Sequence, residues 1–235
     1  MAGIYNYTVE QANVEGRGRA KISFINAIIM QTADVDAYST GFGVETVKKA
    51  NYSWVVSRYA VQIDRIPTIG ENISVETWIG NCEKFFSVRN FILRDESGAT
   101  IGTAISLWAL INLDTRRPMM LEEMHKGVSL DRPEPMSRPA KIGAIQADII
   151  TEHRVAYSDI DFNGHLNSMR SMDHLVDMLP VSEIMNSTRY RLDINFSREA
   201  FAEQVLTLSC QRGEINLFDI SVDGTSLTKA SLQLF

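Results

Sequence analysis

The chain of 235 residues carries 29 Asp and Glu against 23 Lys and Arg, which leaves a formal net charge of −6. This acidic balance argues against a nucleic-acid-binding protein, whose domains usually present a basic surface. With 45% hydrophobic and 22% charged residues, the composition is typical of a globular protein with enough apolar material for one large core or two smaller ones.

Two features of the chain bear on its cellular location. Charged residues precede the apolar run "FINAIIM" (24–30), so no signal peptide is predicted: Glu10, Glu15, Arg17, Arg19 and Lys21. The run itself is far too short to span a bilayer, so no membrane span is expected. The two cysteines, Cys82 and Cys210, have no CxxC spacing, which predicts reduced thiols and a cytoplasmic protein.

Strands dominate the predicted secondary structure, and only two segments have the pattern of helices. The first helix is predicted from near Gly43, over "VETVKKANYS", and strands rich in Val, Ile, Phe and Trp follow at 52–66, 71–80, 85–95 and 102–113. A proline-containing stretch, "LDRPEPMSRPAKIG" (130–143), is the best candidate for a linker. Beyond it we predict a strand at 147–158, the second helix, and strands at 189–197, 204–213, 216–224 and 226–235.

The second predicted helix, "GHLNSMRSMDHLVDML" (164–179), has one apolar face and is terminated by Pro180. Its apolar residues stand three or four positions apart: Leu166, Met169, Met172, Leu175, Val176 and Leu179. A helix of this kind buries its apolar face against a sheet, which predicts strands wrapped round it.

The order of elements repeats along the chain, with strand material, a helix and a run of strands in each half. We align "ADVDAYSTG" with "SDIDFNGHL", which pairs Asp34 with Asp159 and Asp36 with Asp161 at an offset of 159 − 34 = 125 residues. A helix wrapped by consecutive antiparallel strands, occurring twice, predicts an α+β tandem (double) hot-dog fold. The expected domains are 1–135 and 136–235, joined so that the sheet edges are hidden.

The segment "YSDIDFNGHLN" concentrates polar residues immediately before the second predicted helix. Asp161, Asn163 and His165 fall at i, i+2 and i+4, where unpaired amides and the positive end of a helix suit the oxyanion of a thioester or ester. Helix capping explains one or two of these residues equally well, because Asp and Asn are favoured N-caps. In the aligned first half Tyr38 and Thr40 replace Asn163 and His165, and the residues alone leave catalysis and capping open.

Other common site patterns are absent from the sequence. No G-x-S-x-G motif occurs, so a hydrolase serine is not predicted. The four histidines have no HExxH or other close metal-ligand spacing, so neither a metal nor another cofactor is expected: His125, His153, His165 and His174.

Several longer blocks also occur in a characteristic order: "NYSWVVSRYAVQIDRIPTIGENISVETWIG", "RNFILRD", "SLWALINLDTRRP" and "SDIDFNGHLNSM". Over nearly the whole chain these blocks resemble the acyl-ACP thioesterases, which release fatty acids from acyl carrier protein. The resemblance implies that the family's D-x-N-x-H motif falls on Asp161, Asn163 and His165, and that its catalytic Glu falls on Glu199. The family's Cys falls on Ala200, so a thiol mechanism cannot operate at that position.

The resemblance implies a thiolester hydrolase of fatty acid biosynthesis that acts on fatty acyl-acyl carrier protein by general-base activation of water. Glu199 would take the proton, Asn163 would position the water, and Asp161 would orient His165 or Asn163. The helix-start amides and His165 would stabilise the oxyanion.

The same resemblance assigns the acyl tunnel to the first domain, with Trp54, Trp78 and Trp108 as candidates that core packing explains as well. Acyl carrier protein is acidic, so docking needs a local basic surface. The candidate residues for this surface are Arg116, Arg117, Arg138 and Lys141. The competing interpretation is that these four charges are scattered over the solvated surface and form no patch. Two alternative functions stay open at this point: an acyl-CoA thioesterase of the hot-dog fold and a non-catalytic acyl-thioester-binding protein. The oligomeric state also stays open, since the chain could be a monomer or a homodimer.

Overall fold

The computed structural model describes residues 2–80, 83–121 and 131–235, and it divides into two compact units, Met1–Pro139 and Ala140–Phe235. The division falls inside the proline-containing stretch 130–143. Each unit combines helices with an antiparallel sheet, so the chain has the predicted α+β class. Among the described residues, no helix is both long and apolar enough to cross a membrane.

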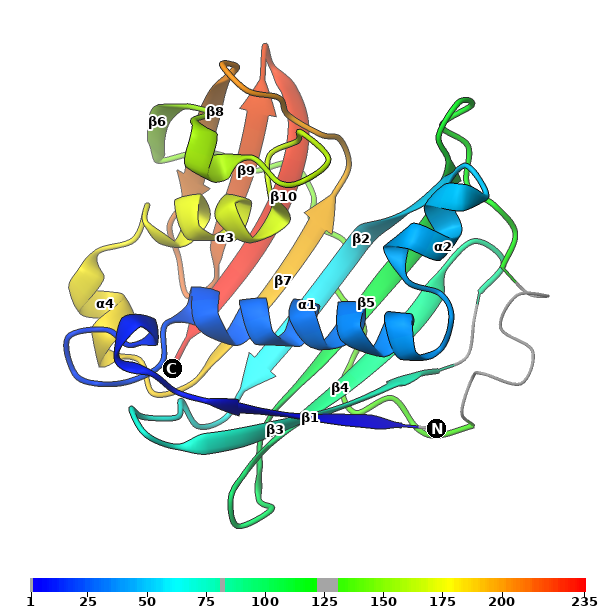
Figure 1. Cartoon of the computed structure of the whole chain (residues 1–235). Coiled ribbons are helices and arrows are strands. Elements are labelled where there is room, and N and C mark those ends of the chain that lie inside the picture. Colours follow the sequence, from blue (N-terminus) through cyan, green and yellow to red (C-terminus); the bar gives the residue numbers. More distant parts are fainter. Residues whose placement is uncertain (1, 81–82, 122–130) are drawn as a thin grey trace. The chain divides into compact units, whose positions relative to one another are not determined.

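In unit 1 (Met1–Pro139) a long helix lies along one face of the sheet (Figure 1). The strands run in the order β1-β3-β4-β5-β2, and each neighbouring pair is antiparallel. The elements of this unit are β1 (Gly3–Thr8), η1 (Gln11–Asn13), α1 (Ile22–Ser39), α2 (Val44–Lys49), β2 (Tyr52–Ile63), β3 (Asn72–Ile79), β4 (Ser87–Asp95) and β5 (Thr100–Asn112).

Alternation along the strands decides which side chains of unit 1 face α1. The Arg89 guanidinium on β4 forms a buried ion pair with Asp36 of α1. Ser106 on β5 is the ladder partner of Arg89, and Trp108 lies two residues further on, so both share the face that α1 covers. This face therefore contains polar groups as well as apolar ones.

Helix α1 is the main element that the sequence-based prediction omits. It spans 18 residues, among them the run "FINAIIM" (24–30) and most of "ADVDAYSTG" (33–41), which the prediction puts ahead of its first helix. Its buried residues recur at helical spacing: Ile22, Ile25, Asn26, Ile28, Ile29, Thr32, Ala33 and Asp36. The prediction fails here because β-branched Ile lowers helix propensity and the buried Asn, Thr and Asp interrupt the apolar pattern. The short helix α2 begins after Gly43 as predicted.

In unit 2 (Ala140–Phe235) the strand order is β7-β10-β9-β8-β6, again with antiparallel neighbours. The elements are β6 (Ile149–Arg154), η2 (Tyr157–Asp159), α3 (Ser168–Val176), α4 (Val181–Asn186), β7 (Tyr190–Phe196), β8 (Val205–Gln211), β9 (Asn216–Val222) and β10 (Thr225–Leu234). All nine strands predicted along the chain are confirmed within a few residues, whereas β1 was not predicted.

Helix α3 buries the apolar face that the sequence predicts, through Met172 and Leu175, each 2% exposed. It begins later than predicted, at Ser168 instead of position 164, because the carboxamide of Asn167 caps it by accepting a hydrogen bond from the Met169 amide at 2.8 Å. The predicted helical residues 164–167 therefore belong to the segment that leads into the helix.

The internal repeat exists, but its register differs from the predicted one. Helix α1 begins at Ile22 and α3 at Ser168, an offset of 168 − 22 = 146 residues. Asp34 and Asp36 lie inside α1, whereas Asp161 precedes α3, so the alignment at an offset of 125 is wrong. A match of two carboxylates is too short to define a register.

A turn that leads into each helix carries the repeat. A bridge Val14–Ala20 closes it in unit 1, and the bridge Ile160–Leu166 closes it in unit 2, again at the offset 160 − 14 = 146. Gly18 and Gly164 occupy equivalent places with φ of 75° and 81°, a backbone conformation that favours glycine. Both units therefore need this turn to start the helix.

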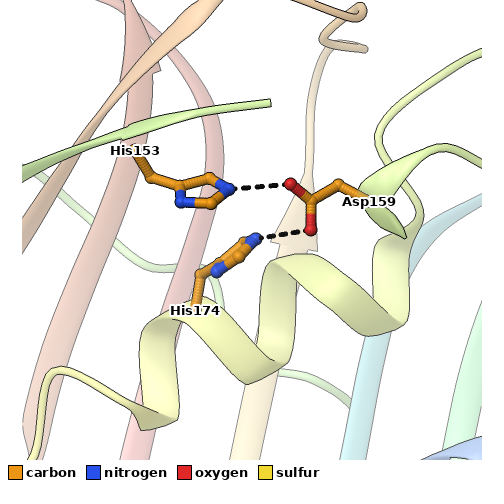
Figure 2. A group of neighbouring side chains, drawn as sticks. All are labelled: His153, Asp159 and His174. Atoms are coloured by element: carbon orange, nitrogen blue, oxygen red, sulfur yellow. Dashed lines mark hydrogen bonds and ion pairs between the residues drawn. The ribbon is translucent and has the colours of Figure 1, made fainter. Parts of the chain in front are cut away.

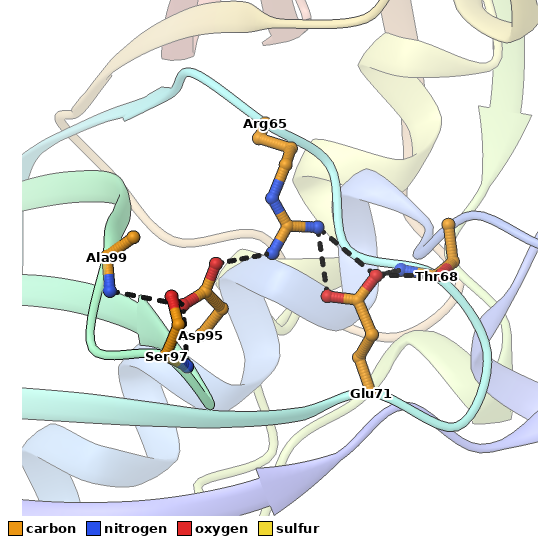
Figure 3. Close-up of polar contacts among 6 residues, drawn as sticks. All are labelled: Arg65, Thr68, Glu71, Asp95, Ser97 and Ala99. Atoms are coloured by element: carbon orange, nitrogen blue, oxygen red, sulfur yellow. Dashed lines mark hydrogen bonds and ion pairs between the residues drawn. The ribbon is translucent and has the colours of Figure 1, made fainter.

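A second element that the two units share is a loop between two strands, β2 and β3 in unit 1 and β7 and β8 in unit 2. In unit 1 the carboxylate of Glu71 accepts hydrogen bonds from the amide and the hydroxyl of Thr68 at 2.9 and 2.7 Å (Figure 3). Arg65 links this carboxylate to Asp95 of β4, at 2.9 and 3.1 Å. The network ties the β2–β3 loop to the β4–β5 loop.

Unit 2 builds the equivalent loop with a carboxamide. Gln204 Oε1 accepts a hydrogen bond from the Phe201 amide at 2.8 Å, just as Glu71 accepts one from Thr68. The offset between these loops is 204 − 71 = 133 residues, 13 less than for the turns, because the intervening segment is shorter in unit 2. By this offset Glu199 corresponds to Ile66.

Candidate active site

The sequence-predicted residues Asp161, Asn163 and His165 all lie in the turn that leads into α3. The amide of Asp161 donates to the carbonyl of His165 at 2.8 Å, and the Gly164 amide donates to the carbonyl of Asp161 at 3.0 Å. The turn ends at Asn167, the residue that caps α3. These hydrogen bonds fix the backbone from which the three side chains project.

Asp161 acts on the backbone of its neighbours. Its Oδ1 accepts hydrogen bonds from the amides of Asn163 at 2.8 Å and His165 at 3.2 Å. The carboxylate thus holds the peptide groups that carry the side chains of Asn163 and His165.

His165 and Glu199 come together although they are 34 residues apart in the sequence (199 − 165). His165 Nδ1 lies 3.3 Å from Glu199 Oε1, and the two side chains are 24% and 30% exposed. The Leu166 amide donates to the Ala200 carbonyl at 2.8 Å, which holds the Glu199 segment against the turn. The site is therefore partly enclosed while water still reaches it.

The aromatic ring of Phe201 completes the surroundings of His165. The two ring centroids lie 5.0 Å apart with the planes nearly perpendicular, an edge-to-face arrangement that restricts the imidazole. Sequence reasoning does not identify Phe201, because its ladder contact with His165 is a tertiary feature.

Three of the amides near the expected oxyanion site already have hydrogen-bond acceptors. The helix begins at Ser168, and the Met169 amide in its first turn is already bonded to Asn167. The amides of Asn163 and His165 are likewise bonded to Asp161. Asn163 is exposed, so its carboxamide faces solvent and can donate hydrogen bonds there.

The equivalent turn in unit 1 separates what the fold requires from what it does not. Glu15 accepts hydrogen bonds from the amides of Arg17 at 2.9 Å and Arg19 at 3.2 Å, as Asp161 does from Asn163 and His165. A carboxylate at this position is therefore part of the turn itself. In unit 1, by contrast, Arg17, Arg19 and Ile66 replace Asn163, His165 and Glu199, so the fold does not require these three residues.

A second polar cluster lies next to the turn, around the buried carboxylate of Asp159. His153 and His174 each approach it through Nε2, and the Ala156 amide donates to it at 2.9 Å. Burial acts to raise the pKa of Asp159, but the hydrogen bonds from His153 and Ala156 outweigh it and hold that pKa below its usual value. Burial and the neighbouring His153 lower the pKa of His174, which favours a neutral imidazole.

Among the described residues, no thiol belongs to this site. Ala200, on which the resemblance places the family's Cys, is 2% exposed and carries no thiol. Cys210 is buried in β8, and burial raises the pKa of its thiol. Cys82 and His125 lie outside the described residues.

Sequence models of two domains match nearly the whole chain. The acyl-ACP thioesterase N-terminal domain matches residues 4–127, and the acyl-ACP thioesterase C-terminal domain matches residues 142–232. Among curated proteins, the chain is 26% identical over 217 residues to the chloroplastic palmitoyl-acyl carrier protein thioesterase of Arabidopsis thaliana. That alignment covers 86% of this chain and 53% of the relative, so the chain spans about half the length of the curated relatives it matches.

Solved structures resemble the chain over its whole length. The crystal structure of an acyl-ACP thioesterase from Bacteroides thetaiotaomicron is 29% identical, with a TM-score of 0.90 over 100% of this chain and 98% of that one. The 12:0-ACP thioesterase from Umbellularia californica, at 22% identity, has a TM-score of 0.87 over 100% and 97% of the two chains, which supports the fold alone.

Proposed function

Because this chain belongs to the acyl-ACP thioesterase family, we propose that it hydrolyses the thioester of fatty acyl-acyl carrier protein to a free fatty acid and the holo carrier protein. The observation that carries the proposal is the pairing of His165 with Glu199, 3.3 Å apart, beside a turn held by Asp161. The other unit of the chain has the same turn without these two side chains.

Glu199 is the general base in this mechanism. Its carboxylate takes a proton from a water molecule, whose oxygen attacks the thioester carbonyl to give a tetrahedral intermediate. When this intermediate collapses, the carbon–sulfur bond breaks, and the sulfur of the carrier protein leaves as a thiol by taking up the proton that Glu199 holds. His165 keeps the carboxylate in place when its Nδ1 carries the proton, and Nε2 is then a hydrogen-bond acceptor. A neutral His165 of this tautomer cannot donate to the oxyanion.

The oxyanion therefore needs another donor, and we assign this role to the carboxamide of Asn163. It is exposed in the turn, and its backbone is fixed by Asp161 at 2.8 Å. A positioned amide N–H stabilises the negative charge that develops on the carbonyl oxygen. Asp161 is then a positioning residue, since it acts through the backbone of Asn163 and His165.

For the acyl chain we propose the α1-facing side of the sheet in unit 1, within the first expected domain (1–135), while the catalytic residues lie in the second (136–235). Of the three tryptophans, Trp78 is 1% exposed and stacked under Arg132 at 4.0 Å, so it supports the core. Trp54 donates to the Phe42 carbonyl at 2.9 Å and packs with α2. Trp108 is partly exposed on the α1-facing side and is the best candidate for an acyl contact.

The carrier protein is the proposed partner, and because it is acidic it needs a basic surface on which to dock. Arg138 forms ion pairs with Glu134 and Glu83, which reduces the positive charge that it offers to an acidic partner. Arg116, Arg117 and Lys141 stay candidates. A cytoplasmic location and a homodimer also stay predictions, and the Arabidopsis thaliana relative is named as chloroplastic.

The decisive experiment measures free thiol release from a chain-length series of acyl-ACPs and from the matched acyl-CoAs. We expect a higher kcat/KM on the carrier protein than on CoA for the same acyl chain. A higher value on CoA would favour an acyl-CoA thioesterase instead. Tight binding of both thioesters without hydrolysis would contradict the proposal and favour a non-catalytic binding protein.

A further inference from the structure

Among the described residues, one group of three side chains has the composition of a metal site. His153 Nε2 lies 2.7 Å from Asp159 Oδ2, and His174 Nε2 lies 3.1 Å from Asp159 Oδ1 (Figure 2). The three ligand atoms all lie within 4.8 Å of one another. They come from β6, η2 and α3, so the sequence spacing of the histidines did not indicate them.

The fold does not require this group. At the repeat offset of 146 residues, Tyr7, Asn13 and Ile28 stand in unit 1 where His153, Asp159 and His174 stand in unit 2. The turn and the helix start form in unit 1 with the same backbone hydrogen bonds. For example, the Lys21 amide donates to the Asn13 carbonyl at 2.9 Å, as the Asn167 amide donates to Asp159 at 2.8 Å.

We propose that His153, Asp159 and His174 form a binding site for a divalent transition-metal ion, with Zn²⁺ as the best-fitting ion. Two imidazole nitrogens and one carboxylate suit Zn²⁺, whereas Mg²⁺ and Ca²⁺ prefer oxygen ligands. Zn²⁺ with bonds of about 2.0 to 2.2 Å places tetrahedral ligand atoms roughly 3.3 Å apart. The observed N–O separations of 2.7 and 3.1 Å need to open by a few tenths of an ångström, whereas the three ligand atoms, which span up to 4.8 Å, need to draw closer together around the ion.

The surroundings allow this rearrangement. His153 is 31% exposed and lies on β6, which ends the strand order of unit 2, so the imidazole can shift and water can reach a fourth coordination position. Asp159 is 1% exposed and held by the Ala156 amide, so its carboxylate is fixed before an ion arrives. The ion would replace the two hydrogen bonds between the imidazoles and Asp159, and each neutral histidine would carry its proton on Nδ1.

One positive charge opposes the ion. Arg170 Nε lies 3.7 Å from Asp159 Oδ1. The same guanidinium also forms an ion pair with Asp173, at 2.9 Å, which compensates part of its charge. Asp159 therefore still contributes negative charge to the site. A bound ion would tie β6, η2 and α3 together beside the turn that carries His165.

The test uses the full chain, freed of metal by a chelator and titrated with Zn²⁺ by calorimetry and thermal unfolding, without any substrate. We expect one Zn²⁺ per chain, no response to Mg²⁺, and a rise in Tm of about 5 °C or more at a hundredfold excess over Kd. His153→Gln and Asp159→Asn should each weaken Zn²⁺ binding by about tenfold to a hundredfold or more. His153→Gln is the safer variant for folding, because this side chain is partly exposed.

The matched control is His165→Gln, which changes a histidine of the adjacent turn that is no member of the group. It should bind Zn²⁺ as the unaltered chain does. The proposal is overturned if the unaltered chain binds no Zn²⁺, if folded His153→Gln binds it equally well, or if His165→Gln abolishes binding. Since the readout is metal binding, it stands apart from the hydrolysis assay, and either proposal can fail alone.

Discussion

Replacing Glu199 by Gln separates the chemistry of the site from its structure. The change keeps the shape of the side chain and removes the carboxylate that we propose as general base. General-base catalysis contributes about 10² to 10⁴ in rate, which at 1.36 kcal/mol for each factor of ten is about 3 to 5 kcal/mol of activation free energy. We therefore expect kcat for acyl-ACP hydrolysis to fall by that factor.

The folding free energy should change far less. The contact between His165 Nδ1 and Glu199 Oε1 is 3.3 Å long, and the side chains are 24% and 30% exposed. Ion pairs that solvent screens contribute about 0 to 1 kcal/mol. For a chain of this size each kcal/mol corresponds to about 2 to 4 °C in Tm, so Tm should shift by a few degrees at most.

The assay combines initial rates of free thiol release from one acyl-ACP with thermal unfolding of the same samples. Glu203→Gln is the matched control, because this glutamate lies four residues further along, is 77% exposed and pairs with Arg154 at 3.1 Å. It should retain the unaltered rate. The reasoning is refuted if Glu199→Gln keeps kcat within about threefold of the unaltered enzyme, or if Glu203→Gln loses as much.

Three further outcomes follow from named contacts. Asp161→Ala removes the acceptor of two amide hydrogen bonds and should lower kcat by about a hundredfold or more, whereas Glu15→Ala removes the same two bonds in unit 1 and should leave kcat nearly unchanged. Equal loss of kcat in both variants would contradict the positioning role. Cys210→Ser should retain kcat, since the thiol is buried with a raised pKa, and an inactive but folded variant would reopen a thiol mechanism. A hydrogen bond from Arg132 lowers the pKa of Glu76, so this pair stabilises the fold above the unfolded pKa of about 4.3 and the contribution is lost as pH falls below it. Arg132→Gln should reduce the fall of Tm that accompanies a lowering of the pH through this range. The same fall in Tm in the variant and in the unaltered chain would show that the pair contributes nothing.

The register of the repeat shows where short motifs mislead. Two aspartates at the same spacing suggested that residues 33–41 correspond to residues 158–166, but the first pair lies inside α1. The true correspondence rests on a turn with a glycine at positive φ and a carboxylate that accepts two amides. Glutamate does this in one unit and aspartate in the other, so the residue type differs while the hydrogen bonds are the same.

The sequence by itself determined the strands and their class of fold. Runs rich in β-branched and aromatic residues, bounded by turn residues, are a local property, and the nine strands predicted from such runs are confirmed within a few residues. The sequence also singled out Asp161, Asn163 and His165, because the three residues are close neighbours in the chain. Longer blocks of sequence also resemble the family, and such blocks can be compared without knowledge of any contact.

Only the tertiary structure decided which side chains meet. It formed α1 from a face of Ile, Asn, Thr and Asp, because packing against the sheet of unit 1 outweighs weak helix propensity. It brought Glu199 to 3.3 Å from His165, and His153 and His174 to one buried carboxylate. Contacts between distant segments depend on how strands pair and where loops turn, and no local pattern encodes those distances.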